Sequence, residues 1–137
     1  MAGFWCSVLT AISMLALIPV AAAAKPTSLA KSIPLEDYLR PQTSVKLEDG
    51  RRFNLFCLGK GSPTAIVDGS LSQWSLEWKD IHAELARTTR VCTFDRAGYG
   101  FSDPGPLPRN SAAETADLEQ ALKAASILSP YVLVGHS

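Results

Sequence analysis

The chain has 137 residues, of which 47% are hydrophobic, and its 13 basic and 13 acidic residues give no net charge. This balance gives no reason to expect nucleic acid or an anionic surface as a partner. The length is enough for one domain with one hydrophobic core.

The first 24 residues carry no charged side chain and include an apolar stretch from Val8 to Val20. An apolar stretch that ends in small residues is typical of a signal peptide, with Ala22 and Ala24 at the positions that a signal peptidase reads. We therefore expect the protein to be exported, either secreted or periplasmic. The alternative is a membrane anchor through residues 4–24, which are numerous enough to span a bilayer.

Residues 25–42 are expected to form a linker, and residues 43–137 the N-terminal part of one domain. Within this domain, weak alternation predicts a strand over Ser44–Glu48, and clear alternation predicts a second over Arg52–Leu58. Asp49-Gly50 lies between them and is a strong hairpin signal. The alternation places Phe53, Leu55 and Cys57 on one face of the second strand.

The middle of the chain predicts a strand, a helix and a strand. The apolar run Thr64–Val67 has the length of a buried strand, and so does Val91–Phe94. The apolar residues between them recur at helical spacing and predict one helix with an apolar stripe. These residues are Trp74, Trp78, Ile81 and Leu85.

The last predicted elements are a helix and a strand. Ser111 and Glu114 have the spacing of a capping box, which predicts a helix that begins there. Its buried stripe is expected at Leu118, Ala121, Leu122 and Ala125, and Tyr131–Val134 is the last strand. Strands that alternate with helices indicate an α/β fold with a mostly parallel sheet.

Three loop motifs each follow a predicted strand: Asp68-Gly69-Ser70, the pattern Asp-Arg-x-Gly-x-Gly-x-Ser over residues 95–102, and Gly135-His136-Ser137. A strand that runs into Gly-x-Ser is how the nucleophile elbow of a serine hydrolase begins. With the three motifs in this order, residues 45–137 resemble the N-terminal half of an α/β-hydrolase of the lipase, esterase and peptidase-like type. The resemblance implies a partial α/β-hydrolase fold, with an antiparallel first hairpin, then parallel strands with flanking helices, truncated after the fifth strand.

The resemblance implies that Ser137 is the nucleophile, which attacks a carbonyl carbon while a histidine takes its proton. The backbone N–H of Ser70 is expected as one donor to the oxyanion, and the residue after Ser137 as the other. The family usually has His-Gly where this chain has Asp68-Gly69. For Asp68, a hydrogen bond that stabilises the loop is favoured over a catalytic role, and both remain open.

Further residues of the motifs are expected to support these loops. Asp95 precedes Ser137, so it is not the triad acid, which follows the nucleophile in this fold. His82 is expected to be a partly exposed helix residue, and His136 to line the pocket or bond to backbone; neither completes a triad. The expected loop-support residues are Gly69, Asp95, Arg96, Gly98, Gly100, Ser102 and Gly135.

The predicted function is that of a serine hydrolase acting on an ester, amide or related acyl bond of a small-molecule substrate. A serine nucleophile argues against the dehalogenase and epoxide-hydrolase branches, in which the resemblance places aspartate. The triad acid and histidine are expected downstream of the chain end, so we expect these 137 residues alone to be inactive. The alternatives are a non-catalytic binding or decoy half-domain, and the product of a truncated gene model. No cofactor, metal or nucleic acid is expected.

The resemblance also implies that the second strand lies antiparallel beside the fourth, which brings Cys57 near Cys92. An exported protein matures where disulfides persist. A disulfide between these residues and a pair of buried free thiols are both open.

Overall fold

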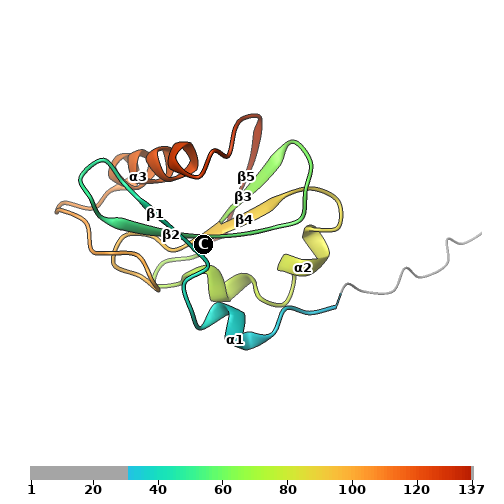
Figure 1. The fold of residues 1–137 in the computed structure, drawn as a ribbon. Helices are drawn as coiled ribbons and strands as arrows, with labels where there is room; N and C mark the ends of the chain where they lie inside the picture. The colour runs from blue at the N-terminus through green and yellow to red at the C-terminus, as the bar shows by residue number, and fades with distance from the viewer. Residues whose placement is uncertain (1–30, 137) are drawn as a thin grey trace, which may run out of the picture.

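The computed structural model describes residues 31–136, in which five strands form one sheet of order β1-β2-β4-β3-β5 (Figure 1). The predictions for the signal peptide and for Ser137 lie outside the described residues. The strands are β1 (Thr43–Lys46), β2 (Arg52–Leu58), β3 (Thr64–Asp68), β4 (Val91–Phe94) and β5 (Tyr131–Gly135). β2 pairs antiparallel with β1 and with β4, whereas β3 pairs parallel with β4 and with β5. The predicted fold class, an antiparallel hairpin followed by parallel strands, is therefore confirmed.

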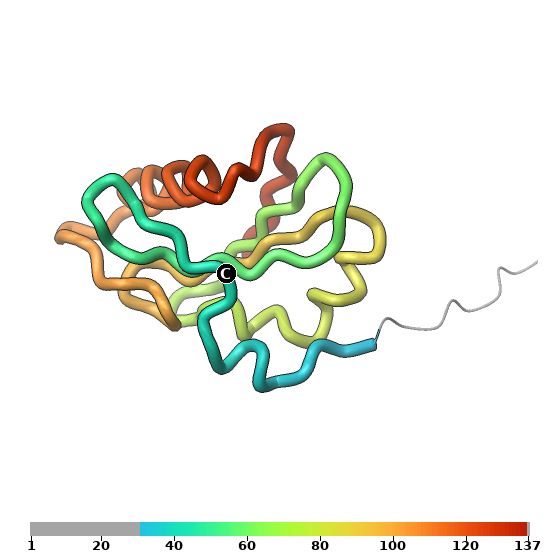
Figure 2. The backbone as a smooth tube through the Cα atoms, viewed as in Figure 1, coloured from blue at the N-terminus to red at the C-terminus, as the bar shows by residue number. Residues whose placement is uncertain are grey.

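Helices cover both faces of the sheet (Figure 1). One face carries α3 (Ser111–Ala124), and the other carries α1 (Leu35–Tyr38), the 3-10 helix η1 (Ser75–Trp78) and α2 (His82–Leu85). Figure 2 shows the course of the backbone from α1 through the first hairpin and, at the red C-terminal end of the chain, through α3 into β5. The arrangement is a three-layer α/β structure, with short helical turns forming one of the outer layers.

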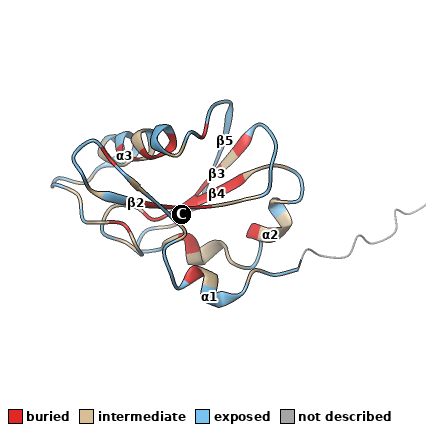
Figure 3. Cartoon of the chain, in the orientation of Figure 1, coloured by how far each residue is buried: buried red, intermediate tan, exposed pale blue. Residues whose placement is uncertain are grey.

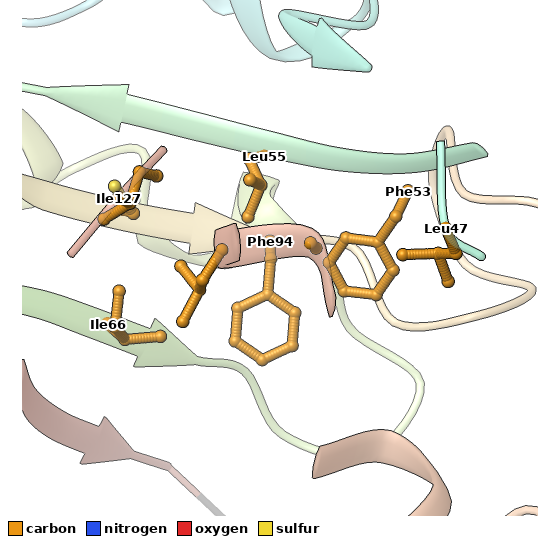
Figure 4. Close-up of a cluster of buried hydrophobic side chains, with 9 residues drawn as sticks. Leu47, Phe53, Leu55, Ile66, Phe94 and Ile127 are labelled. Atoms are coloured by element: carbon orange, nitrogen blue, oxygen red, sulfur yellow. The ribbon is translucent and has the colours of Figure 1, made fainter. Parts of the chain in front are cut away.

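Alternation in β2 supplies side chains to both layers. Phe53 and Leu55 are buried in the core beneath α3, where the Phe53 ring stacks on Phe94 with centroids 5.8 Å apart (Figure 4). Phe56, one residue further on, points to the other face and meets the ring of Tyr38 at 4.9 Å. Burial of each such side chain contributes about 1.5–3 kcal/mol. The predicted inward face of the second strand is confirmed, since Cys57 also packs against the core beneath α3.

The prediction of one continuous helix with an apolar stripe between β3 and β4 is wrong. The structure has two short turns instead, η1 and α2, and Ile81 and Leu85 of the stripe are 45% and 39% exposed. The residues that turn inward are the polar Ser75 and His82. Hydrogen bonds to buried partners outweigh the apolar periodicity here, because Ser75 bonds to Asp95 and His82 to the Val91 carbonyl.

The predicted capping box at the start of α3 is also wrong. Asn110 is the N-cap, and its side-chain oxygen accepts a hydrogen bond from the Ala113 N–H at 3.0 Å. Glu114 faces Arg96 instead, at 3.5 Å. The stripe of this helix is as predicted: Ala121 and Leu122 are buried, and Leu118 and Ala125 are partly buried against the same core.

Part of the segment expected as a linker is folded. Residues 35–38 form α1, and the Tyr38 side chain is buried against Phe56. The Tyr38 hydroxyl lies 3.1 Å from Nδ1 of His82, so α1 is attached to α2. Burial, followed by the charges of Asp37 and Asp80, raises the pKa of Tyr38 to about 12, so the hydroxyl keeps its proton.

Cys57 and Cys92 face each other across the antiparallel pair β2 and β4, and a disulfide joins them with an S–S distance of 2.07 Å. The bond links the hairpin half of the sheet to its parallel half.

The strand β5 lies at the edge of the sheet and is the most exposed strand in the described part of the chain. All five of its residues are exposed, with Leu133 at 74%, whereas β3 and β4 are largely buried (Figure 3). No helix within residues 31–136 has both the length and the apolar character required to cross a membrane.

Candidate active site

Two of the loop motifs lie side by side because their strands are parallel neighbours. In the register of β3 and β5, Asp68 is the partner of Gly135, so both strands end at the same edge of the sheet. The backbone N–H of His136 then donates to the Asp68 carbonyl at 3.2 Å. Ser137 follows His136 directly in sequence, although its own placement lies outside the described residues. The structure therefore brings the β3 loop, residues 68–70, next to the end of β5.

Arg96 holds one side of the β3 loop. Its guanidinium donates to both carboxylate oxygens of Asp68, at 3.0 and 2.8 Å, and to the Gly69 carbonyl at 2.7 Å. A fork of this kind is among the strongest hydrogen-bonded arrangements in proteins. The bonds to Asp68 raise the pKa of Arg96 against the opposing effect of its burial. Asp68 therefore forms an ion pair with Arg96, as expected of a side chain that stabilises the loop.

Glu77 of η1 holds the other side of the β3 loop. Its Oε2 accepts from the Ser70 backbone N–H at 2.8 Å, and its Oε1 accepts from the Ser70 hydroxyl at 2.9 Å. The same Oε1 lies 2.7 Å from Nδ1 of His136. Because a carboxylate is only an acceptor, that imidazole nitrogen carries a proton. Glu77 therefore connects the two loops that the sheet places together.

These contacts keep Glu77 ionised. Burial acts to raise the pKa of its carboxyl, but the hydrogen bonds from the Ser70 N–H, from His136 and from the Ser70 hydroxyl outweigh it, so the pKa is lowered. Gly69 makes the approach possible, because a Cβ added there would lie 2.6 Å from Glu77 Oε2. The backbone donor expected at Ser70 is present in the structure, and it is bound to this carboxylate.

Sequence reasoning missed Glu77. It lies between Leu76 and Trp78 on the polar side of the predicted helical stripe, where the spacing favours exposure to solvent. No local motif marks it, since its partners are seven residues before it and 59 residues after it.

Asp95 is a buried anchor for the loop that follows β4. Its Oδ1 accepts from the backbone N–H and hydroxyl of Ser75, at 3.0 and 2.6 Å. Its Oδ2 accepts from the side-chain amide of Asn54 at 2.9 Å and from the Phe101 N–H at 3.0 Å. Four donors therefore surround a carboxylate that is fully buried. Asp95 fastens its own loop to β2 and η1.

Two glycines shape this loop around Asp95. Gly100 has a φ of +48°, and a Cβ added there would lie 2.3 Å from Asp95 Oδ2. Gly98 has a φ of +85°, and its N–H donates to the Asp103 carbonyl at 3.1 Å. Ser102 completes the loop, since its hydroxyl donates to the Asp95 carbonyl at 2.6 Å and accepts from the Asn54 N–H at 2.9 Å.

The two histidines occupy different environments. The expectation that His82 is partly exposed is wrong: its side chain is fully buried, between the Tyr38 hydroxyl and the Val91 carbonyl. Burial lowers the pKa of His82, against the bond to Val91 that raises it. His136 is exposed and lies edge-on to the Trp78 ring, with centroids 6.4 Å apart.

An open pocket of about 460 Å³ adjoins the end of β5. Its lining comes from η1, from the segment before α2 and from the end of β5, and consists of Glu77, Trp78, Asp80, Ile81, Gly135 and His136. Within residues 31–136, no three His, Cys, Asp or Glu side chains lie close enough together to hold a metal ion. The chemistry that this site offers is that of backbone donors, a carboxylate and an imidazole.

Comparison with known proteins gives concordant results. The model of the alpha/beta hydrolase family matches residues 62–137. A probable transporter of Hormonema carpetanum, efuK, is 37% identical over 79 residues, which are 56% of this chain and 11% of that protein. The chain spans about a third or less of the length of the curated relatives it matches.

Among solved structures, an alpha/beta hydrolase from Novosphingobium aromaticivorans superposes with a TM-score of 0.62 at 22% identity, over 69% of this chain and 34% of that one. An esterase from Thermogutta terrifontis, with malate bound, has a TM-score of 0.62 at 21% identity, over 69% and 36%. At these identities the likeness concerns the fold.

Proposed function

This chain belongs to the alpha/beta hydrolase family, and from that premise we propose that it carries the nucleophile and one oxyanion donor of a serine hydrolase. The reaction proposed is the cleavage of an ester, amide or related acyl bond. One observation supports it above all: the register of β3 and β5 pairs Asp68 with Gly135, and the His136 N–H bonds to the Asp68 carbonyl, so the β3 loop lies beside the two residues that precede Ser137 in the sequence. An acyl-transfer site needs a nucleophile close to backbone donors, and the proposal assigns these roles to Ser137 and to the β3 loop.

In the proposed reaction the Ser137 hydroxyl attacks the carbonyl carbon, and a histidine accepts its proton. The carbonyl oxygen becomes an oxyanion, to which the Ser70 N–H is the proposed donor from the β3 loop. Arg96 fixes that loop through Asp68 and Gly69, so the donor is positioned before the substrate arrives. Collapse of the tetrahedral intermediate expels the alcohol or amine and leaves an acyl group on the serine, which water then removes.

Neither histidine of this chain is proposed as the base. His82 is buried between the Tyr38 hydroxyl and the Val91 carbonyl, which bond to its two ring nitrogens, and His136 is engaged with Glu77. In this fold the acid and the base follow the nucleophile in the chain, so the proposal places both after residue 137. Residues 1–137 by themselves should then hydrolyse an ester no faster than their Ser137→Ala variant.

We also propose that the protein is exported. The apolar, uncharged residues 1–24 support this proposal, and so does the disulfide between Cys57 and Cys92, since disulfides persist in oxidising compartments.

The first test of the proposed function is the DNA that follows codon 137. A reading frame that continues with x-Gly, and later encodes an acid and a histidine, supports it, whereas an immediate stop codon contradicts it. The second test is hydrolysis of p-nitrophenyl esters by the protein expressed from its full reading frame. Ser137→Ala should abolish turnover, and Ser44→Ala, at an exposed position of β1, should leave it unchanged.

A further inference from the structure

Glu77 makes a contact that bears directly on the proposed reaction. We infer that Glu77 is a positioning residue of the site. In the resting protein its carboxylate accepts the hydrogen bond of the Ser70 N–H, and it must release that donor before an oxyanion can bind there. This inference rests on the proposed function, because the proposed reaction makes the Ser70 N–H an oxyanion donor.

The contact is close and multiple. Glu77 Oε2 lies 2.8 Å from the Ser70 nitrogen, and Oε1 lies 2.9 Å from the Ser70 hydroxyl. The carboxylate is mostly buried, with 17% of the side chain exposed, and its lowered pKa keeps it charged at neutral pH. It therefore binds the donor as an anion, which is the role that an oxyanion would have in the reaction.

A carboxylate that stayed in place would oppose the reaction. An oxyanion at the Ser70 N–H would lie within hydrogen-bonding distance of the same nitrogen as Oε2, so two negative charges would be a few ångströms apart. Away from bulk water such a pair repels strongly. Both anions would also compete for one N–H group. Glu77 has to move off the nitrogen as charge develops on the substrate.

The structure offers a place for the displaced carboxylate. Oε1 already lies 2.7 Å from His136 Nδ1, and both side chains line the open pocket beside β5. Rotation of the carboxylate can separate Oε2 from Ser70 while the bond to His136 remains. Arg96 holds Asp68 and Gly69 from the other side, so the loop keeps its place when Glu77 releases it.

The test compares Glu77→Gln with the unchanged protein, expressed from its full reading frame. An amide oxygen still accepts from the Ser70 N–H, but without charge, and hydrogen bonds to charged groups are roughly twice as strong as neutral ones. We therefore expect kcat/KM for a p-nitrophenyl ester to rise by about 5- to 10-fold. A trifluoromethyl ketone, which forms a tetrahedral oxyanion on serine, should bind more tightly by a similar factor. A purely structural role for Glu77 would weaken both.

Glu84→Gln is the matched control, since it removes the same charge from a residue of α2 whose side chain is 44% exposed and pairs with Arg87. It should leave both kcat/KM and the inhibitor affinity unchanged. A second readout needs no activity: the Ser70 amide proton resonance should titrate with the Glu77 carboxyl in acid. It should cease to do so in Glu77→Gln, and in Gly69→Ala, whose methyl group would displace Oε2.

The outcomes separate the inference from the proposed function. If the unchanged protein and Ser137→Ala hydrolyse esters equally, the proposed function fails and the inference fails with it. If Ser137-dependent turnover is present but Glu77→Gln is no faster than the unchanged protein, only the inference is overturned. A Ser70 amide resonance that is insensitive to acid, or that titrates equally in Glu77→Gln, also overturns it.

Discussion

Replacement of Asp95 by Asn tests whether this buried carboxylate organises the loops around the site. The side chain keeps its shape, but one oxygen becomes an N–H₂ group. Each oxygen accepts from two donors, Oδ1 from Ser75 and Oδ2 from Asn54 and Phe101. Whichever way the amide turns, two buried donors lose their acceptor.

Each buried donor without a partner costs about 1–3 kcal/mol, so Asp95→Asn should lower the free energy of unfolding by about 2–6 kcal/mol. The Ser75 hydroxyl can rotate to accept from the new amide, which favours the lower part of that range. For comparison, a domain has about 5–15 kcal/mol of stability in total. A loss of about 3 kcal/mol, with a slope near 1.5 kcal/mol per molar urea, shifts the unfolding midpoint by about 2 M.

The assay is urea unfolding followed by tryptophan fluorescence, with the disulfide intact. Asp80→Asn is the matched control, because Asp80 is 81% exposed beside Lys79, and it should leave the midpoint unchanged. If Asp95→Asn and the unchanged protein unfold at the same urea concentration, the four hydrogen bonds do not hold these loops, and the assignment of Asp95 as their anchor is refuted.

Two further predictions concern His82 and the disulfide. Burial lowers the pKa of His82 in the folded state. As the pH falls below about 6.5, the unfolded chain therefore binds a proton before the folded protein does, and the free energy of unfolding should decrease until the pH reaches the pKa of the folded state. The decrease is at most about 1.4 kcal/mol per pH unit. Urea unfolding between pH 7.5 and 5 should show this decrease, and His82→Gln should flatten it; an equal decrease in both proteins would refute the assignment to His82. Cys57 and Cys92, 35 residues apart in sequence, should resist thiol labelling until reduction, and reduction should lower the stability by about 2–4 kcal/mol. Labelling of both without reductant would instead show two free thiols.

The strands were predictable from the sequence because their signals are local. Arg52–Leu58 and Val91–Phe94 have the predicted bounds, and Asp49-Gly50 joins the first two strands as expected. In β2, alternation identified the face that packs beneath α3. Short runs of β-branched and aromatic residues between turn residues carry this information without help from the rest of the chain.

The region between β3 and β4 was not predictable, because distant groups decide it. The apolar spacing favours one helix, but Ser75 hydrogen-bonds to the buried Asp95 carboxylate and His82 to the Val91 carbonyl. These bonds turn the two polar residues toward the interior. The role of Glu77 is not predictable for the same reason, since its partners Ser70 and His136 come together only when β5 pairs with β3. Hydrogen bonds to buried groups outweighed the local periodicity in these places.

Covalent labelling with a fluorophosphonate tests the central claim, that Ser137 is the nucleophile of a serine hydrolase, most directly. In this reaction the serine oxygen bonds to phosphorus, fluoride leaves, and the hydroxyl proton passes to the base. We predict that the protein expressed from its full reading frame gains a single phosphonyl group, that peptide mass spectrometry locates it on Ser137, and that Ser137→Ala gains none. An intact, folded protein that is unlabelled, or that is labelled equally in Ser137→Ala, would contradict the account.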